Sequence, residues 1–128
     1  MRALASTCLV CVLCCSVRAG DKDVLNGSYL LDACTDSIKD HEGDHTRDRF
    51  RIGYCEGFIS AMMDSIVVLK YEMPDGKSVK YACPPPEVSF GQVLHTFVKY
   101  LNDHPEDLHK TAYSLGLRAL SDAFPCTR

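Results

Sequence analysis

The sequence lacks the features that would bring a protein to nucleic acid or hold it in a membrane. Its 14 Lys and Arg residues face 17 Asp and Glu residues, so the formal net charge is −3. A chain without excess positive charge is poorly suited to phosphate backbones and anionic lipid surfaces. No apolar run reaches the ~20 residues of a membrane-spanning helix, because Arg18 and Asp21 end the first one. The sequence also contains no internal repeat, which excludes a repeat protein.

The first 19 residues have the pattern of an export signal. Met1-Arg2 gives a charged start, residues 3–17 form an apolar run, and Val17-Arg18-Ala19 ends it with a small residue. We predict a secretory signal peptide that is cleaved after Ala19. Residues 20–128 are then expected to form a single domain, with 12 basic and 17 acidic residues and a net charge of −5. An acidic domain of this size suits a cationic protein partner.

The cysteines divide into two groups. Four lie in the leader, and the other four stand singly after it, at Cys34, Cys55, Cys83 and Cys126. An even number of cysteines in an exported chain predicts two disulfides and no free thiol. We expect the pairs Cys55–Cys83 and Cys34–Cys126, because residues 71–82 can run back along a helix to place Cys83 beside Cys55. A disulfide at Cys55 would also exclude Cys55 as a catalytic nucleophile with His95 or His109 as its base.

Apolar residues recur at intervals of three and four after the leader, which predicts helices. Ser28 can cap a first helix, a polar connection is expected from Asp36 to Arg51, and a long second helix is expected from about Arg47 to Lys70. Gly53 and Gly57 in that helix are expected to let another helix approach closely. The apolar faces consist of Leu30, Leu31, Cys34 and Ile38 in the first helix, and of Phe50, Tyr54, Phe58, Met62, Ile66 and Leu69 in the second.

Turn and cap signals divide the second half of the chain. Pro74-Asp75-Gly76 predicts a short hairpin or a protruding loop. Ser89 and Gln92 form a capping box for a third helix, which places Phe90, Leu94, Phe97, Val98 and Leu101 on one face and stops at His104. Pro105 suits the start of a fourth helix that ends at Pro125. The predicted fold class is all-α: a compact bundle of about four helices with one protruding loop or short hairpin, tied by two disulfides.

One motif matches a catalytic signature. The letters of His41-Glu42-Gly43-Asp44-His45 are those of H-E-x-x-H, which in zinc proteases places two histidines on one helical face with a glutamate as base. Here Gly43 weakens the helix, the flanking residues are polar, and a third ligand is undefined. We therefore interpret this segment as a solvated loop and predict neither a metal nor another cofactor.

Several segments together resemble the Rap/Tai family of immunity proteins. The family's C-x-G-[YF]-[IL]-x-[GA] helix start is similar to residues 55–61, and the later elements follow in the family's order. The resemblance extends from about Leu30 to Cys126. It rests on Tyr54 to Ala61, Cys83-Pro84, Val88 to Val93, Val98 to Leu101, His104-Pro105-Glu106, His109 and Ala123 to Cys126.

This resemblance implies an all-α, periplasmic and often dimeric domain with no enzymatic activity. Members of the family guard bacteria against peptidoglycan-cleaving amidase effectors of type VI secretion, so the implied partner is such an effector, with a homodimer as a further possibility. From the residues themselves we expect steric occlusion of the amidase by the protrusion, through Met73, Asp75 and Lys77. The acidic stretch from Asp40 to Asp48 is the competing contact surface, and an ordinary exposed turn is the alternative for the protrusion.

Two other functions stay open on the sequence alone. An acid-stress periplasmic chaperone of the Hde type is also small, helical and disulfide-tied, and five histidines with many carboxylates could respond to low pH. A zinc hydrolase on His41 to His45 is the remote alternative.

Overall fold

The computed structural model describes residues 26–71 and 82–126, with side chains as far as residue 66 in the first range. These ranges contain α1 (Gly27–His41), α2 (Arg49–Tyr71), α3 (Phe90–Asp103), the short 3-10 helix η2 (Pro105–Asp107) and α4 (Ala112–Ala123). The predicted all-α bundle of about four helices is thus confirmed. None of the helices in the described part combines the length and apolar character that crossing a membrane requires.

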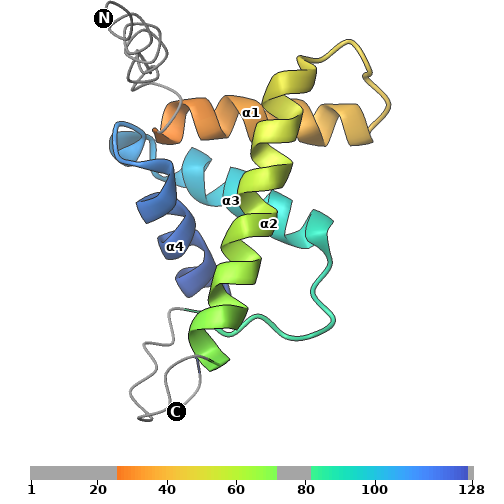
Figure 1. Ribbon diagram of the computed structural model, residues 1–128. Coiled ribbons are helices and arrows are strands. Elements are labelled where there is room, and N and C mark those ends of the chain that lie inside the picture. Colours follow the sequence, from red (N-terminus) through yellow and green to blue (C-terminus); the bar gives the residue numbers. More distant parts are fainter. Residues whose placement is uncertain (1–25, 72–81, 127–128) are drawn as a thin grey trace, which may run out of the picture.

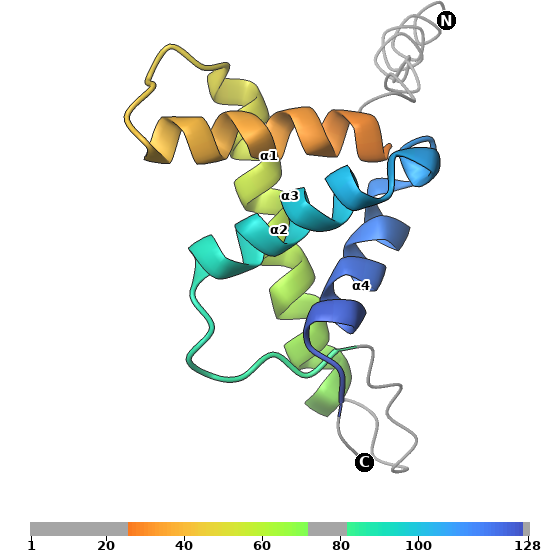
Figure 2. The ribbon, with the colours of Figure 1, turned by 180° about the vertical axis from the view of Figure 1, so that it is seen from behind.

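The helices are arranged around the long α2. Helix α1 crosses the N-terminal half of α2, and α4 lies beside the C-terminal half (Figure 1). Helix α3 runs across α2 below α1 and packs against both α1 and α4 (Figure 2). Each helix therefore contributes one face to a shared interior.

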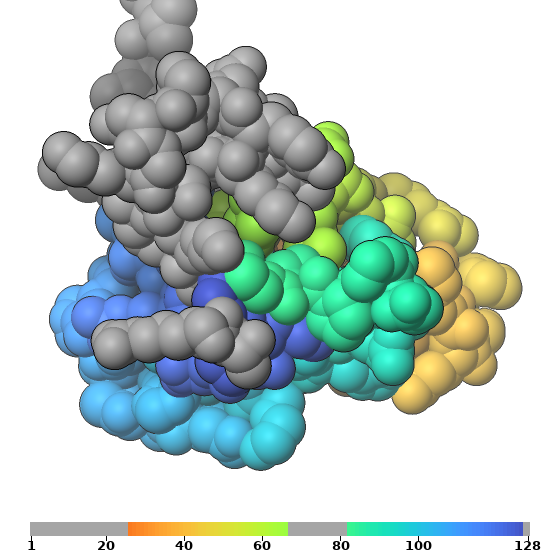
Figure 3. All heavy atoms as spheres, turned by 90° about the horizontal axis from the view of Figure 1, so that it is seen from below, coloured from red at the N-terminus to blue at the C-terminus, as the bar shows by residue number. Residues whose placement is uncertain are grey.

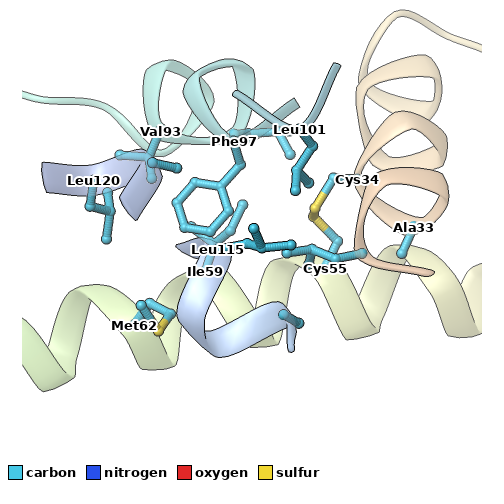
Figure 4. Packing of buried hydrophobic residues seen from close by; sticks show 14 of the residues in the cluster. Ala33, Cys34, Cys55, Ile59, Met62, Val93, Phe97, Leu101, Leu115 and Leu120 are labelled. Atoms are coloured by element: carbon cyan, nitrogen blue, oxygen red, sulfur yellow. A yellow bond between two sulfur atoms is a disulfide. The ribbon is translucent and has the colours of Figure 1, made fainter. Parts of the chain in front are cut away.

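Phe97 of α3 lies at the centre of that interior. Its side chain is completely buried, and its ring meets Phe58 of α2 edge-on at 6.1 Å between centroids. Figure 4 shows Phe97 among Ile59 and Met62 of α2 and Leu115 of α4. The four helices bury one continuous cluster, which is the arrangement that their apolar periodicity predicts. The cluster consists of Leu30, Ala33, Cys34, Cys55, Ile59, Met62, Ala82, Val93, Leu94, Phe97, Leu101, Ala112, Leu115, Ala119 and Leu120.

Two disulfides are present, as predicted, but the predicted pairing is wrong. Cys34 of α1 bonds to Cys55 of α2, and Cys83 bonds to Cys126. Because α1 crosses α2 where both cysteines face the core, the first pair is fully buried. Cys83 instead lies beside the end of α4, where its backbone N–H donates to the carbonyl of Phe124 at 2.8 Å. The segment before α3 therefore binds the C-terminal tail rather than running back to Cys55.

Helix α1 begins and ends differently from the prediction. Its N-cap is Asn26 rather than Ser28, because the Asn26 side chain accepts a hydrogen bond from the Tyr29 N–H at 2.9 Å. It continues to His41, through part of the stretch that was predicted to be a polar connection. The helix tolerates this polar end because Ser37 is buried and bonded to Glu56, and because arginines from the next segment pair with Asp36 and Asp40.

The predicted fourth helix is divided in two. Pro105 starts only the short η2, and α4 begins at Ala112 with Thr111 as its N-cap. At the interruption, the carbonyls of Leu108 and Lys110 accept hydrogen bonds from the Ser28 and Gly27 N–H groups at the start of α1. These bonds tie the start of α1 to the turn between η2 and α4.

The glycines that pack tightly are not the ones predicted. A Cβ atom at Gly53 or Gly57 would meet nothing within 4 Å, so no helix of the described chain approaches them. The close approach occurs at Gly27, where a Cβ atom would lie 2.3 Å from Leu115 Cδ1 and 3.0 Å from the Leu108 carbonyl. Glycine at this position therefore lets α1 dock closely on the η2–α4 junction, and a larger residue would force its neighbours to shift.

This difference predicts opposite effects of the same substitution. Gly53→Ala and Gly57→Ala should each raise the free energy of unfolding by about 0.4–1 kcal/mol, because alanine restricts the unfolded chain and favours the helix without a clash. Gly27→Ala should lower it by about 1–3 kcal/mol through overpacking. Denaturant titration measures all three variants. Destabilisation by Gly53→Ala would show that α2 is closely covered at this position in solution.

The disulfide arrangement predicts an order of chemical reduction. Cys83 is exposed, whereas Cys34 and Cys55 have no exposed surface. Mild reduction of the native protein followed by alkylation should label Cys83 and Cys126 first, and Cys34 and Cys55 only when the protein unfolds. In the chain-entropy treatment, loops of 21 and 43 residues contribute about 3 and about 4 kcal/mol to stability. Simultaneous labelling of all four cysteines would contradict the buried position of the first pair.

Candidate functional site

The residues predicted to bind a partner lie outside the described residues. Met73, Asp75 and Lys77 fall between residues 71 and 82, where the structure describes no conformation. The competing contact surface, Asp40 to Asp48, is fully described. The candidate site that follows consists of described surface residues.

The H-E-x-x-H letters do not lie on one helix. His41 is the last residue of α1, and Gly43 has a φ of +102°, a left-handed conformation that ends the helical path. His41 Nε2 is 3.1 Å from Glu56 Oε1, and His45 Nδ1 is 3.0 Å from Asp40 Oδ1. Within the described ranges, His, Cys, Asp and Glu side chains form no group of three that could hold a metal. The segment thus lacks the geometry that zinc-protease chemistry needs.

The carboxylates of the acidic stretch are largely neutralised by arginines of the same segment. Asp44 accepts hydrogen bonds from Thr46 Oγ1 at 2.6 Å and from Arg47 Nε at 2.8 Å. Asp40 lies 3.1 Å from Arg49. Asp48 accepts the Phe50 N–H at 2.8 Å at the start of α2. Because these groups already have partners in this chain, the stretch presents less negative charge than its composition indicates.

These contacts change the acidity of two carboxyl groups. Hydrogen bonds from Thr46 and from Arg47 lower the pKa of Asp44 from the ordinary aspartate range to about 2. The hydrogen bond with His45, assisted by the charge of Arg49, lowers the pKa of Asp40. In both cases the partners favour the ionised carboxylate. The loop between α1 and α2 is therefore held together by charge.

A polar contact that the sequence did not indicate lies beside the buried disulfide. Ser37 Oγ is completely buried and donates to Glu56 Oε1 at 3.0 Å. Ser37 and Glu56 follow Cys34 and Cys55 on the two helices that this disulfide joins. Serine, glutamate and His41 are the residue types of a hydrolase triad, but the buried serine bonds to the carboxylate and not to the imidazole. These three side chains therefore stabilise the crossing of α1 and α2.

An exposed aromatic residue at the start of α3 forms a more distinctive surface. Phe90 is 38% exposed and stands apart from the buried core, although the sequence placed it on the apolar face of this helix. Two hollows lie on either side of it. One, of about 250 Å³, separates it from α2 and is lined by Ile59, Ser60, Met63, Asp64, Val88, Phe90 and Val93. The other, of about 270 Å³, faces the end of α1 and is lined by Ile38, His41, Glu42, Phe90, Gly91, Leu94 and His95.

The position of Phe90 is fixed by local structure. Ser89 and Gln92 form the predicted capping box, in which the Gln92 side chain accepts the Ser89 N–H at 2.7 Å. Val88 packs against the buried core immediately before it. Figure 3 shows that the segment from Ala82 to the start of α3 lies between α1 and α4, next to the C-terminal half of α2. One hollow therefore lies between α2 and the start of α3, and the other between the end of α1 and α3.

The low pKa of Asp44 predicts how stability depends on acid. Its pKa is about 2 in the folded protein and about 3.9 in an unfolded chain. The stabilisation by the ionised form is thus complete above about pH 4 and is lost as the pH falls toward 2. Thermal unfolding from pH 5 to pH 2 should show a smaller decrease for Asp44→Asn than for the wild type, and Asp44→Asn should be less stable at pH 5. Equal decreases would contradict these contacts.

Comparison with known proteins gives one result. A family model described as Rap1a immunity proteins matches residues 26–126, which includes every helix described above. Neither the curated proteins nor the solved structures contain a match.

Proposed function

Because the chain belongs to the Rap1a family of immunity proteins, we propose that it is the periplasmic inhibitor of a peptidoglycan amidase effector delivered by type VI secretion. The family establishes an immunity protein against a secreted effector. The amidase as the target, type VI secretion as the route and the periplasm as the compartment are our proposal. The observation that carries the proposal is the family match, which covers the whole described fold.

Two features support the periplasm as the place of action. Residues 1–19 have the charge and apolar pattern of a signal peptide. The fold depends on two disulfides, and such bonds persist in oxidising compartments such as the bacterial periplasm. A peptidoglycan amidase acts in that same compartment, so inhibitor and effector would meet there.

The proposed mechanism is steric occlusion without chemistry. In this mechanism the immunity protein covers the cleft of the amidase and excludes the cell wall from it. A scaffold that is cross-linked between α1 and α2 and again between Cys83 and Cys126 loses little conformational freedom when it binds. Rigid helices with surface hollows suit this role.

Protection of cells tests the proposal directly. Exported amidases encoded beside the gene for this chain would be produced in the periplasm of a host, with or without the full chain. Co-production of the full chain should prevent lysis, and a variant that begins at Gly20 should not, because it stays in the cytoplasm. A variant with an unrelated signal peptide in front of Gly20 is the matched control and should protect again.

Each outcome has a clear meaning. Lysis in the presence of the full chain for every such amidase would overturn the amidase as the target. Equal protection by the variant that begins at Gly20 would overturn the periplasm as the compartment.

A further inference from the structure

We propose that the amidase effector binds at the two hollows that flank Phe90, through a segment that carries an apolar side chain next to a lysine or arginine. This inference rests on the proposed function, because it takes the effector as the occupant. It assigns the contact to described residues of α1, α2 and α3. It takes in Glu42 from the stretch between Asp40 and Asp48, but neither the paired carboxylates Asp40 and Asp44 nor Met73 to Lys77.

The apolar part of the surface can accept a side chain. Ile59, Met63, Val88 and Val93 line the hollow between Phe90 and α2, and Ile38 and Leu94 line the one toward α1. Met63 is half-buried, and methionine adapts its shape to a partner more readily than branched side chains do. A few residues, often aromatic anchors, supply most of the binding energy at an interface, and Phe90 is placed to act as one.

The charge at this surface indicates that the partner segment is cationic. Asp64 lines one hollow and Glu42 lines the other, and neither carboxylate has an ion pair or hydrogen bond to any side chain in the described part of the chain. The described lining includes neither lysine nor arginine; its basic side chains are His41, which contacts Glu56, and His95. By contrast, Asp40 and Asp44 already pair with arginines. The hollows therefore offer the negative charge that a cationic segment would complement.

An enzyme that cleaves peptidoglycan peptides can supply such a segment. The stem peptides carry free carboxylates, so a cleft that binds them is expected to present positive charge. The chain described here has a net negative charge, which would steer it toward that cleft. Apolar contact at Phe90 would then hold the complex, and the two carboxylates would set its orientation.

An exposed aromatic residue and an exposed carboxylate elsewhere on the surface provide internal controls. Phe50 is 69% exposed at the start of α2, where its neighbours Arg49 and Arg51 pair with Asp40 and Asp36. Asp32 is an exposed carboxylate on α1 that, like Asp64, has no partner among the described residues. Phe50→Ala and Asp32→Asn thus remove the same chemical groups at positions outside the hollows.

The test measures binding of purified variants to the amidase against which the full chain protects. Phe90→Ala should weaken the equilibrium affinity by about 30-fold or more, the loss typical of an interface hot spot. Glu42→Gln/Asp64→Asn should slow association by about 10-fold and reduce its dependence on salt. Phe50→Ala and Asp32→Asn should bind within about 2-fold of the wild type. Circular dichroism melts should show that each variant is folded.

The results separate this inference from the proposed function. If the wild type binds and inhibits the amidase while Phe90→Ala and Glu42→Gln/Asp64→Asn bind equally well, the hollows are not the contact and the proposed function stands. Should Phe90→Ala fail to fold, the two carboxylate substitutions, which keep side-chain size, decide the question. If the wild type protects against none of the amidases, both the function and the occupant of the hollows are wrong.

Discussion

The buried bond between Cys34 and Cys55 is the constraint on which the rest of the structure depends. It fixes the point at which α1 crosses α2, and it brings Ser37 next to Glu56 one turn further along α1. With the two helices held at this point, Phe97 of α3 fills the space beneath them, and Figure 4 shows the disulfide beside the same cluster of side chains. A small helical domain gains much of its rigidity from such a link, since its core alone is modest.

This rigidity connects the fold with the proposed role. The family match gives an immunity protein, and an inhibitor that plugs a cleft works best when its shape is set before it binds. Two parts of the surface differ in the role that we assign to them. At the turn between α1 and α2, charges are paired within the chain and stabilise it. At the start of α3, Phe90 lies between two hollows whose carboxylates, Glu42 and Asp64, have no side-chain partner among the described residues, and we propose this surface as the contact with the effector.

The sequence predicted the helices well because their signals are local. The spacing of apolar residues located all four, and the capping box at Ser89 placed the start of α3 correctly. Prediction from the sequence failed where contacts between distant residues determine the structure. The alternative cysteine pairings differ in how the helices cross, which spacing does not reveal. The break before α4 coincides with hydrogen bonds from the Gly27 and Ser28 N–H groups, which are far away in the sequence. The Phe90 surface was missed for the same reason. Periodicity places Phe90 on the apolar face of its helix but does not show whether a neighbouring helix covers it.

Hydrogen exchange of the immunity protein, free and in complex with its amidase, tests the account most directly. The first N–H groups of α3, at Phe90 and Gly91, precede the first helical acceptors and should exchange rapidly in the free protein. We predict that the amidase slows hydrogen exchange there and around Glu42, while exchange in the middle of α4 is unchanged. Slowed exchange confined to α4, with none at the start of α3, would contradict it.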